Sequence, residues 1–223
     1  MTEFTTWRSL VDGEEIIGIP DSVVEDFERD DPLDDYDGDT EDYSTTSDAI
    51  QGSTSISSTG DSGEAIQLVD VVVDSLPEKG DEFSYLVEGR DDDAGPIVMW
   101  GVPDPADDDG YEVWVNIPDD EILFNDRTGS TLDSESVSLS ANQVYEVVVD
   151  WQDNDDIDIE VFEFDEEEFN RGESVATLSA NDDTHADNNG IAFRSQGGSS
   201  PTNVFDWVVI GPEDGQYDGD PGE

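Results

Sequence analysis

The chain has 223 residues with 61 acidic and seven basic side chains, which gives a formal net charge of -54 at neutral pH. Such a surface repels phosphate backbones, so we expect no nucleic acid as a partner. No segment of the sequence approaches the ~20 consecutive apolar residues of a membrane span, so we expect no membrane as a partner either. The chain has no cysteine, which excludes disulfide bonds, thiolate metal sites and cysteine nucleophiles.

The chain opens with an apolar segment, residues 1–22, that ends in the turn sequence Pro20-Asp21-Ser22. Because chain termini are loose unless they are tied down, this segment is either a first strand packed on the main domain or an arm that anchors the chain to another protein. Residues 1–10 have neither the basic region nor the apolar stretch of an export signal, so we expect no secretion. The anchoring residues of such an arm are Phe4, Trp7, Leu10, Ile16 and Ile17.

Residues 23–211 form a succession of short segments rich in Val, Ile, Phe, Tyr and Trp, separated by Gly, Pro, Asp and Ser. This pattern predicts one all-β domain, a two-sheet antiparallel jelly-roll sandwich with no clear helix. Residues 212–223 are rich in Gly, Pro and acids, and we expect them to form an exposed tail. The predicted strands are 43–48, 53–57, 64–74, 82–88, 97–102, 111–117, 137–140, 144–151, 157–164, 175–180, 190–195 and 204–210.

The apolar residues favour a folded domain over the disorder that acidic chains often show. They make up 34% of the chain, include five Trp, six Tyr and nine Phe, and are concentrated in the predicted strands, so they can build a core. Repulsion among so many acids weakens a compact state in dilute salt, but at molar salt the Debye length falls to about 3 Å and the repulsion is screened. We therefore expect a protein adapted to near-saturated salt.

Alternation within segment 111–117 predicts a surface for sugar binding. The odd-numbered residues are apolar and share the core face, so Trp114 lies on the opposite face, flanked by Glu112 and Asn116. An aromatic ring packs on the apolar face of a pyranose while polar groups bind its hydroxyls. The alternative is that Trp114 belongs to a second layer of core, because a large sandwich often buries both faces of one sheet. With two residues from neighbouring segments, the candidate carbohydrate-binding residues are Trp100, Glu112, Trp114, Asn116 and Arg194.

Two further polar residues are expected at the surface. In segment 144–151 the odd-numbered residues face inward, so Glu146 should face solvent. His185 lies in the polar stretch 182–187 and has no Ser or Cys partner at a recognisable spacing. No catalytic triad can therefore be assembled around it, and we expect an exposed loop.

Several segments resemble the concanavalin A-like lectin/glucanase fold, which also includes laminin G-like domains, as found in proteins of salt-adapted archaea. The matching segments cover most of residues 25–211. They are similar to the beginning, the central meander and the closing strands of such domains. The resemblance implies the fold, whereas the same fold serves lectins, hydrolases and structural modules. The segments are 26–28, 36–40, 43–44, 144–151, 157–164, 175–179, 189–195 and 205–210.

The resemblance also implies two kinds of site. Relatives that cleave glycans use carboxylates on one strand, about 5 Å apart in a retaining mechanism. The nearest match is Asp158, Glu160 and Glu163, which a strand with one bulge would place on one face. The family order of Glu, Asp and Glu is not reproduced, and such spacing arises by chance in so acidic a chain, so we expect no enzyme. Relatives often join their terminal strands through a metal, and the corresponding Ca²⁺ ligands here would be Glu25, Glu28 and Asp206.

The first residues carry a second resemblance. Residues 5–13 (TTWRSLVDG) and 19–22 (IPDS) resemble the start of virion proteins from tailed viruses of halophilic archaea. This implies a non-enzymatic virion surface protein, either a capsid turret or a tail fibre, that assembles as a homo-oligomer in the host cytoplasm. Its arm would contact other virion proteins, and its jelly roll would bind host glycan or surface-layer glycoprotein. A cellular carbohydrate-binding module and a glycoside hydrolase remain as alternatives, and neighbouring capsid, portal and tail genes would favour the first interpretation.

Overall fold

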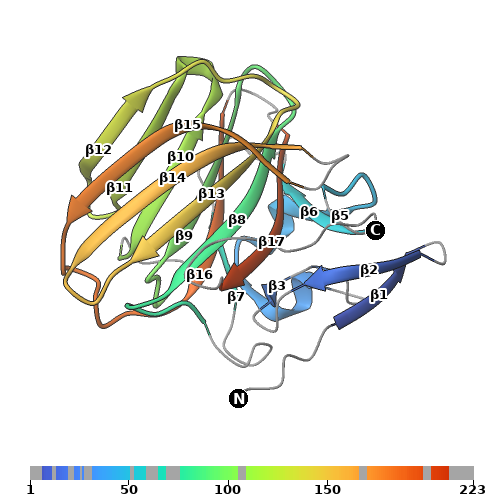
Figure 1. Cartoon of the computed structure of the whole chain (residues 1–223), viewed down its shortest axis with the longest axis horizontal. Helices are drawn as coiled ribbons and strands as arrows, with labels where there is room; N and C mark the ends of the chain where they lie inside the picture. The colour runs from blue at the N-terminus through green and yellow to red at the C-terminus, as the bar shows by residue number, and fades with distance from the viewer. Residues whose placement is uncertain are drawn as a thin grey trace.

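The computed structural model describes residues 7–11, 14–19, 23–25, 27, 32–50, 53–58, 65–68, 76–104, 109–165, 170–197 and 202–210. Two antiparallel β-sheets pack face to face, which confirms the predicted all-β sandwich (Figure 1). One sheet has seven strands and is called the β10 sheet after its strand β10 (Tyr111–Asn116). The other has eight strands and is called the β13 sheet after β13 (Val144–Trp151). Helical structure in the described residues is limited to short 3₁₀ turns at Pro32–Asp35, Thr40–Asp42 and Ile117–Asp119.

The strands of each sheet come from distant parts of the chain. Besides β10, the β10 sheet contains β4 (Tyr36–Gly38), β7 (Ala65–Leu68), β9 (Ala94–Trp100), β11 (Glu121–Asp126), β12 (Ser130–Ser136) and β16 (Ile191–Gly197), in the order β12-β11-β10-β9-β16-β7-β4. Besides β13, the β13 sheet contains β3 (Val23–Glu25), β5 (Tyr43–Thr46), β6 (Ser55–Ser58), β8 (Glu82–Gly89), β14 (Asp156–Asp165), β15 (Asn170–Asn181) and β17 (Asn203–Ile210). Its order is β15-β14-β13-β8-β17-β6-β5, and β3 pairs with the C-terminal half of β17.

Most predicted strands are present, and polarity explains why one strand, β12, is missing from the prediction. The strand predicted at 137–140 is wrong, because these residues form a loop between β12 and β13. Strands β11 and β12 are absent from the predicted set. Leu132 is the sole apolar residue of β12, which lies at the edge of its sheet, where polar residues discourage pairing with other chains.

The core lies between the sheets and is crossed by hydrogen bonds from buried tyrosines. Tyr85 of the β13 sheet donates its hydroxyl to the carbonyl oxygen of Met99 in the β10 sheet at 2.9 Å. Tyr43 donates in the same way to the carbonyl oxygen of Phe193 at 3.1 Å. Each bond joins a strand of one sheet to a strand of the other. The two sheets are therefore fixed to each other by directional bonds as well as by apolar packing.

Carboxylates close one side of the sandwich, where the outer strands β12 and β15 lie. An oxygen of Glu135 accepts a hydrogen bond from the backbone nitrogen of Thr177 at 2.9 Å, and an oxygen of Asp133 accepts one from that of Ser179 at 3.0 Å. Unpaired backbone groups on an edge strand form a template for pairing with another chain. The two acids therefore protect the edge of β15.

The N-terminal segment forms a small sheet of its own, in which β1 (Trp7–Val11) pairs with β2 (Glu14–Ile19). Within the described residues, these two strands pair with no strand of the sandwich, and Figure 1 shows them to one side of it. Of the proposed anchoring positions, Trp7 and Leu10 lie in β1, and Ile16 and Ile17 lie in β2. Phe4 and the tail 212–223 lie outside the described residues. The described part of the chain contains no helix long and apolar enough to cross a bilayer.

Candidate functional site

Strand β10 has the alternation that its sequence predicts. Tyr111, Val113 and Val115 are buried in the core between the sheets. Trp114 is half-buried on the opposite, outer face of the β10 sheet, the face that also carries Glu112. The residues on the outer face of β10 are therefore not part of the core between the sheets and are available for binding.

The strand register brings Arg194 to this outer face. Trp114 lies opposite Ile97 of β9, and Ile97 lies opposite Arg194 of β16, so the three residues form a line across adjacent strands. The guanidinium nitrogen Nη2 of Arg194 lies 3.3 Å from Oε2 of Glu112. The structure therefore brings Glu112, Trp114 and Arg194 together, as the sequence predicts.

Trp100 does not join this group, which corrects the predicted set. It lies opposite Tyr111 in the β9–β10 ladder, and residues directly opposite each other in antiparallel strands share a face. Tyr111 faces the core, so Trp100 does too. Its ring is fully buried and stacks on Phe124, with centroids 5.8 Å apart and planes 22° apart.

Asn116 is on the predicted face, but its side chain is already used. It is 3% exposed, and its amide nitrogen donates to a carboxylate oxygen of Asp119 at 3.0 Å. This bond fixes the short 3₁₀ turn that follows β10. In this structure Asn116 therefore stabilises the end of the strand.

The indole of Trp114 lies across β9 at Gly95. A β-carbon at position 95 would collide with the indole nitrogen Nε1 and come within 3.3 Å of Cδ1 of the same ring. Glycine is therefore required for this ring position. Trp114 also packs against an apolar cluster on the outer face, Ala65, Ile97, Met99, Val102 and Ala192. The cluster is buried, as the second-layer alternative predicts, whereas Trp114 at its margin is only half-buried.

Three polar atoms at this face are shielded from solvent and form no hydrogen bond with the described residues. They are Oε2 of Glu112, Nε1 of Trp114 and Nε of Arg194. The other oxygen of Glu112 accepts a hydrogen bond from the amide of Asn125 at 3.1 Å. A buried polar group without a hydrogen bond costs about 1–3 kcal/mol, so native proteins keep few of them. Such atoms also occur in the core, at the indole nitrogens of Trp100 and Trp151, whereas here three of them lie together on one outer face.

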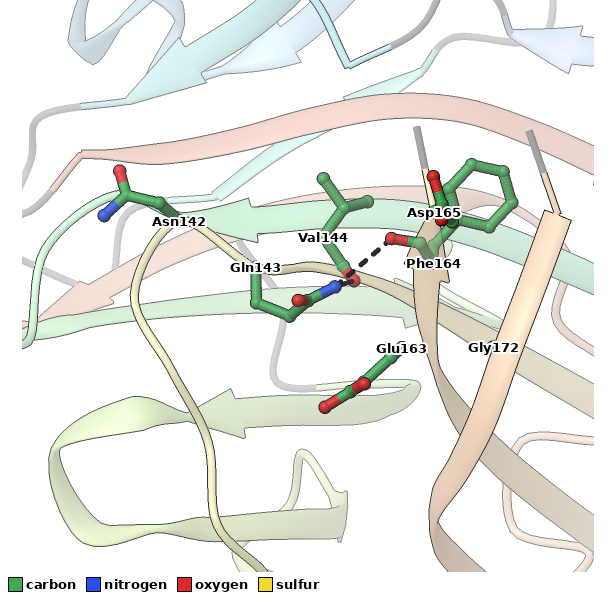
Figure 2. A pocket seen from close by; sticks show the side chains of 7 residues that line it. All are labelled: Asn142, Gln143, Val144, Glu163, Phe164, Asp165 and Gly172. Atoms are coloured by element: carbon green, nitrogen blue, oxygen red, sulfur yellow. Dashed lines mark hydrogen bonds between the residues drawn. The ribbon is translucent and has the colours of Figure 1, made fainter. Parts of the chain in front are cut away.

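A second feature is a polar cleft of about 330 Å³ where β13 begins and β14 ends (Figure 2). The amide nitrogen of Gln143 donates to the carbonyl oxygens of Val144 and Phe164 at 2.8 and 3.2 Å, so it closes the floor of the cleft. Among the residues that the structure describes, its lining has carboxylates but no basic side chain. The described residues that line it, Asn142, Gln143, Val144, Glu163, Phe164, Asp165 and Gly172, offer no exposed aromatic plate for a sugar.

The carboxylates considered for catalysis are not gathered on one face. Strand β14 pairs with β13 without interruption, with Asp158 opposite Asp150 and Glu163 opposite Tyr145. Tyr145 faces the core, so Glu163 lies on the other side of the sheet from Asp158 and Glu160. The bulges that the strand does contain affect its pairing with β15 instead.

His185 is buried, so the prediction of an exposed loop is wrong. It is 2% exposed, its Nε2 lies 3.0 Å from Oδ1 of Asp126, and its ring meets the ring of Tyr111 edge to face at 4.9 Å. Burial alone would raise the pKa of Asp126, but hydrogen bonds from His185 and Thr128 outweigh it and hold the pKa below its usual range. The hydroxyl of Tyr111 donates to Asp182 at 2.7 Å. The network ties the loop after β15 to the ends of β10 and β11.

Glu146 points away from the core as predicted, yet it is fully buried. The guanidinium of Arg171 binds both its carboxylate oxygens, at 2.6 and 2.9 Å, and lies 5.0 Å from the ring centre of Phe162. A planar guanidinium matches a carboxylate through two parallel bonds, which compensates for the loss of water around Glu146. The sequence does not reveal this partner, because Arg171 comes from β15, two strands away.

Of the three ligands expected for calcium, Asp206 is the one whose side chain the structure describes. Asp206 is 1% exposed, and its two oxygens accept hydrogen bonds from the Ser55 hydroxyl at 2.5 Å and from the Trp207 backbone nitrogen at 2.7 Å. Glu25 lies in β3 opposite Val208, and Glu28 lies outside the described residues. Among the described residues, no group of three or more His, Cys, Asp or Glu side chains is arranged to hold a metal ion.

Comparison with protein-family models and with curated protein sequences found no match. Among solved structures, the chain is similar to a Bacillus subtilis protein of unknown function with a galectin-like fold. The TM-score is 0.56 at 8% identity, over 92% of this chain and 98% of that one. At this identity the likeness shows the fold alone, which is of the lectin type that the sequence predicts.

Weaker likenesses accompany this one and carry no argument about activity. An endo-beta-1,4-glucuronan lyase from Trichoderma reesei has a TM-score of 0.47 at 13% identity, over 98% of both chains. The winged bean acidic lectin has a TM-score of 0.46 at 10% identity, over 81% of this chain and 98% of that one.

Proposed function

We propose that this protein is a non-enzymatic glycan-binding domain whose sugar site is the outer face of the β10 sheet around Trp114. The observation that carries the proposal is the combination of a half-buried indole held in place over Gly95 with a Glu112–Arg194 pair beside it. Shielded polar atoms without hydrogen bonds on all three side chains support it further.

The proposed binding reaction is association without a chemical step. The indole packs against the apolar face of a pyranose ring, which removes apolar surface of both partners from water. Glu112 holds the guanidinium of Arg194 at the face, and Arg194 donates to a sugar oxygen.

Replacing Trp114 by Ala tests this proposal. Glycan binding measured by calorimetry in molar salt should weaken by about 30-fold or more, because aromatic anchors contribute much of the binding energy at such faces. Phe162→Ala is the matched control, since Phe162 is a half-buried aromatic residue of the β13 sheet. Wild-type affinity in the Trp114→Ala protein would exclude this face as the site.

We further propose that the domain is displayed on the surface of a virion from a virus of halophilic archaea and binds glycan or glycoprotein of the host surface. The support is the net charge of -54, suited to high salt, and the resemblance of residues 5–13 and 19–22 to virion proteins. In this proposal the N-terminal arm contacts other virion proteins and holds the chain in a homo-oligomer. The pairing of β1 and β2 apart from the sandwich is compatible with such an arm.

Deleting residues 1–22 tests the role of the arm. The deletion removes β1 and β2 but no strand of either sandwich sheet, so the domain should stay folded and soluble. Its mass in solution, measured by light scattering, should fall to that of a monomer, and it should no longer join particles. Assembly that persists without residues 1–22 would contradict the proposal.

A further inference from the structure

The basic residues are few, and one of them stands apart. Five of the seven have side chains that the structure describes: Lys79, Arg90, Arg127, Arg171 and Arg194. The first four each donate at least one hydrogen bond to a carboxylate or a carbonyl oxygen. Arg194 donates none within the described part of the chain. In a protein with 61 acids, an arginine without a hydrogen-bonded acceptor needs an explanation.

Glu112 does not satisfy Arg194. The separation of 3.3 Å between the two side chains is an ion-pair contact without a hydrogen bond, and the other carboxylate oxygen is bound to Asn125. The side chain of Arg194 is only 22% exposed, and its Nε is shielded from solvent. With Nε1 of Trp114, the face has two shielded donor atoms without acceptors against one shielded acceptor atom, Oε2 of Glu112. These shielded atoms lie beneath the surface, so a ligand meets the exposed part of the Arg194 side chain, whose guanidinium can only donate hydrogen bonds, and the ligand must supply acceptors to it.

We propose that the glycan bound at this face is acidic, with a carboxylate or sulfate of one sugar unit accepting hydrogen bonds from Arg194 while a sugar ring covers Trp114. This inference rests on the proposed function and names the class of its ligand. An oxyanion offers a guanidinium two or more strong acceptors in the geometry of its N–H groups, whereas the hydroxyl of a neutral sugar offers one weaker acceptor.

The net charge of -54 opposes such a ligand in dilute salt but not in the salt that the composition predicts. At molar ionic strength the Debye length is about 3 Å, so the field of distant carboxylates is screened while a guanidinium in direct contact still binds. Contact with Arg194 then outweighs the long-range repulsion. Affinity for an acidic glycan should accordingly increase with salt concentration. Binding that is driven by attraction between opposite charges usually shows the reverse, because salt weakens that attraction.

The test uses the full-length protein in molar salt and pairs of oligosaccharides that differ only in charge. Oligomers of galacturonate, glucuronate and mannuronate are each compared with their methyl esters, and a sulfated galactan oligomer is compared with its desulfated form. Wild-type protein should bind at least one acidic member about tenfold more tightly than its neutral partner, as a charge-assisted hydrogen bond predicts. The uronate and sulfate pairs show which oxyanion is preferred.

Two variants assign the preference to Arg194. In Arg194→Gln the ratio of the two affinities should fall to about one or two, because the acidic partner loses more binding free energy than the neutral one. Arg127→Gln is the matched control: Arg127 follows β11 and donates to the backbone carbonyl of Asp109, and its loss changes the net charge by the same amount. This variant should keep the preference.

Failure of the inference is distinguishable from failure of the proposed function. The inference is overturned if no acidic member binds more tightly than its neutral partner, or if the preference survives in Arg194→Gln. Those results leave the sugar site in place as long as Trp114→Ala weakens binding of both members of a pair. Undiminished binding of both members by Trp114→Ala overturns the proposed function itself.

Discussion

The substitution Gly95→Ala tests whether the position of the Trp114 ring is what binds a sugar. The added methyl group would collide with the indole nitrogen and would lie 3.2 Å from the backbone oxygen of Gln196 in β16. That oxygen belongs to β16, which pairs with β9, so the backbone hydrogen bonds between the two strands hold it in place. The half-buried indole is the group that can move, and we expect it to leave its place against β9.

The expected magnitudes separate stability from binding. A methyl group inserted into a packed site costs about 1–3 kcal/mol, and the half-exposed position of Trp114 favours the lower end, about 1 kcal/mol. Displacing an aromatic anchor from a binding face costs about 2 kcal/mol or more, which is about a 30-fold increase in Kd. Gly95→Ala should therefore damage binding far more than it damages the fold.

Calorimetry in molar salt and a double-mutant cycle provide the assay. If the methyl group acts only by moving the ring, adding Gly95→Ala to Trp114→Ala should not change Kd further. A melting curve for each variant checks that the fold is retained. An unchanged Kd in Gly95→Ala alone, or a further loss in the double variant, would refute the reasoning.

Three further outcomes are expected. Replacing Arg171 by Met leaves the buried carboxylate of Glu146 unpaired and should cost about 3–5 kcal/mol of unfolding free energy in denaturant titrations, whereas changing both residues to Met should restore most of it. The pKa of Asp126 is lowered in the folded state, so its contribution is present above the unfolded pKa and is lost as the pH falls through the folded value. Asp126→Asn should thus be less stable than wild type by about 1 kcal/mol at neutral pH, and the two melting curves should converge below about pH 4. Replacing Asp133 and Glu135 by Ala uncovers the edge of β15 and should produce dimers in size-exclusion chromatography, and a strictly monomeric double variant would contradict that role.

Local alternation was sufficient to predict the faces of the central strands. Segment 111–117 is strictly alternating, so Trp114 could be placed opposite the core before the fold was known. Alternation failed for β12, whose polar sequence follows from its position at the edge of the sheet. A strand is recognised by its buried face, and β12 buries little.

Partners from distant strands were beyond the reach of the sequence. The sequence predicts Trp100 on the sugar face, but its face depends on which residue of β10 lies opposite it. Glu146 is buried because Arg171, 25 residues later, covers it. His185 is buried because the loop that holds it folds onto Tyr111, a residue 74 positions earlier. Each outcome depends on a contact between segments whose register only the folded structure determines.

The indole resonances of the protein test the central claim most directly. In nitrogen-15 correlation spectra recorded in molar salt, the Trp114 signal is identified by its loss in Trp114→Phe, and the acidic oligosaccharide with the highest affinity is then added. Our account predicts that the Trp114 signal moves with ligand concentration while the signals of the buried Trp100 and Trp151 remain in place. Saturable binding that leaves the Trp114 signal unmoved would contradict it.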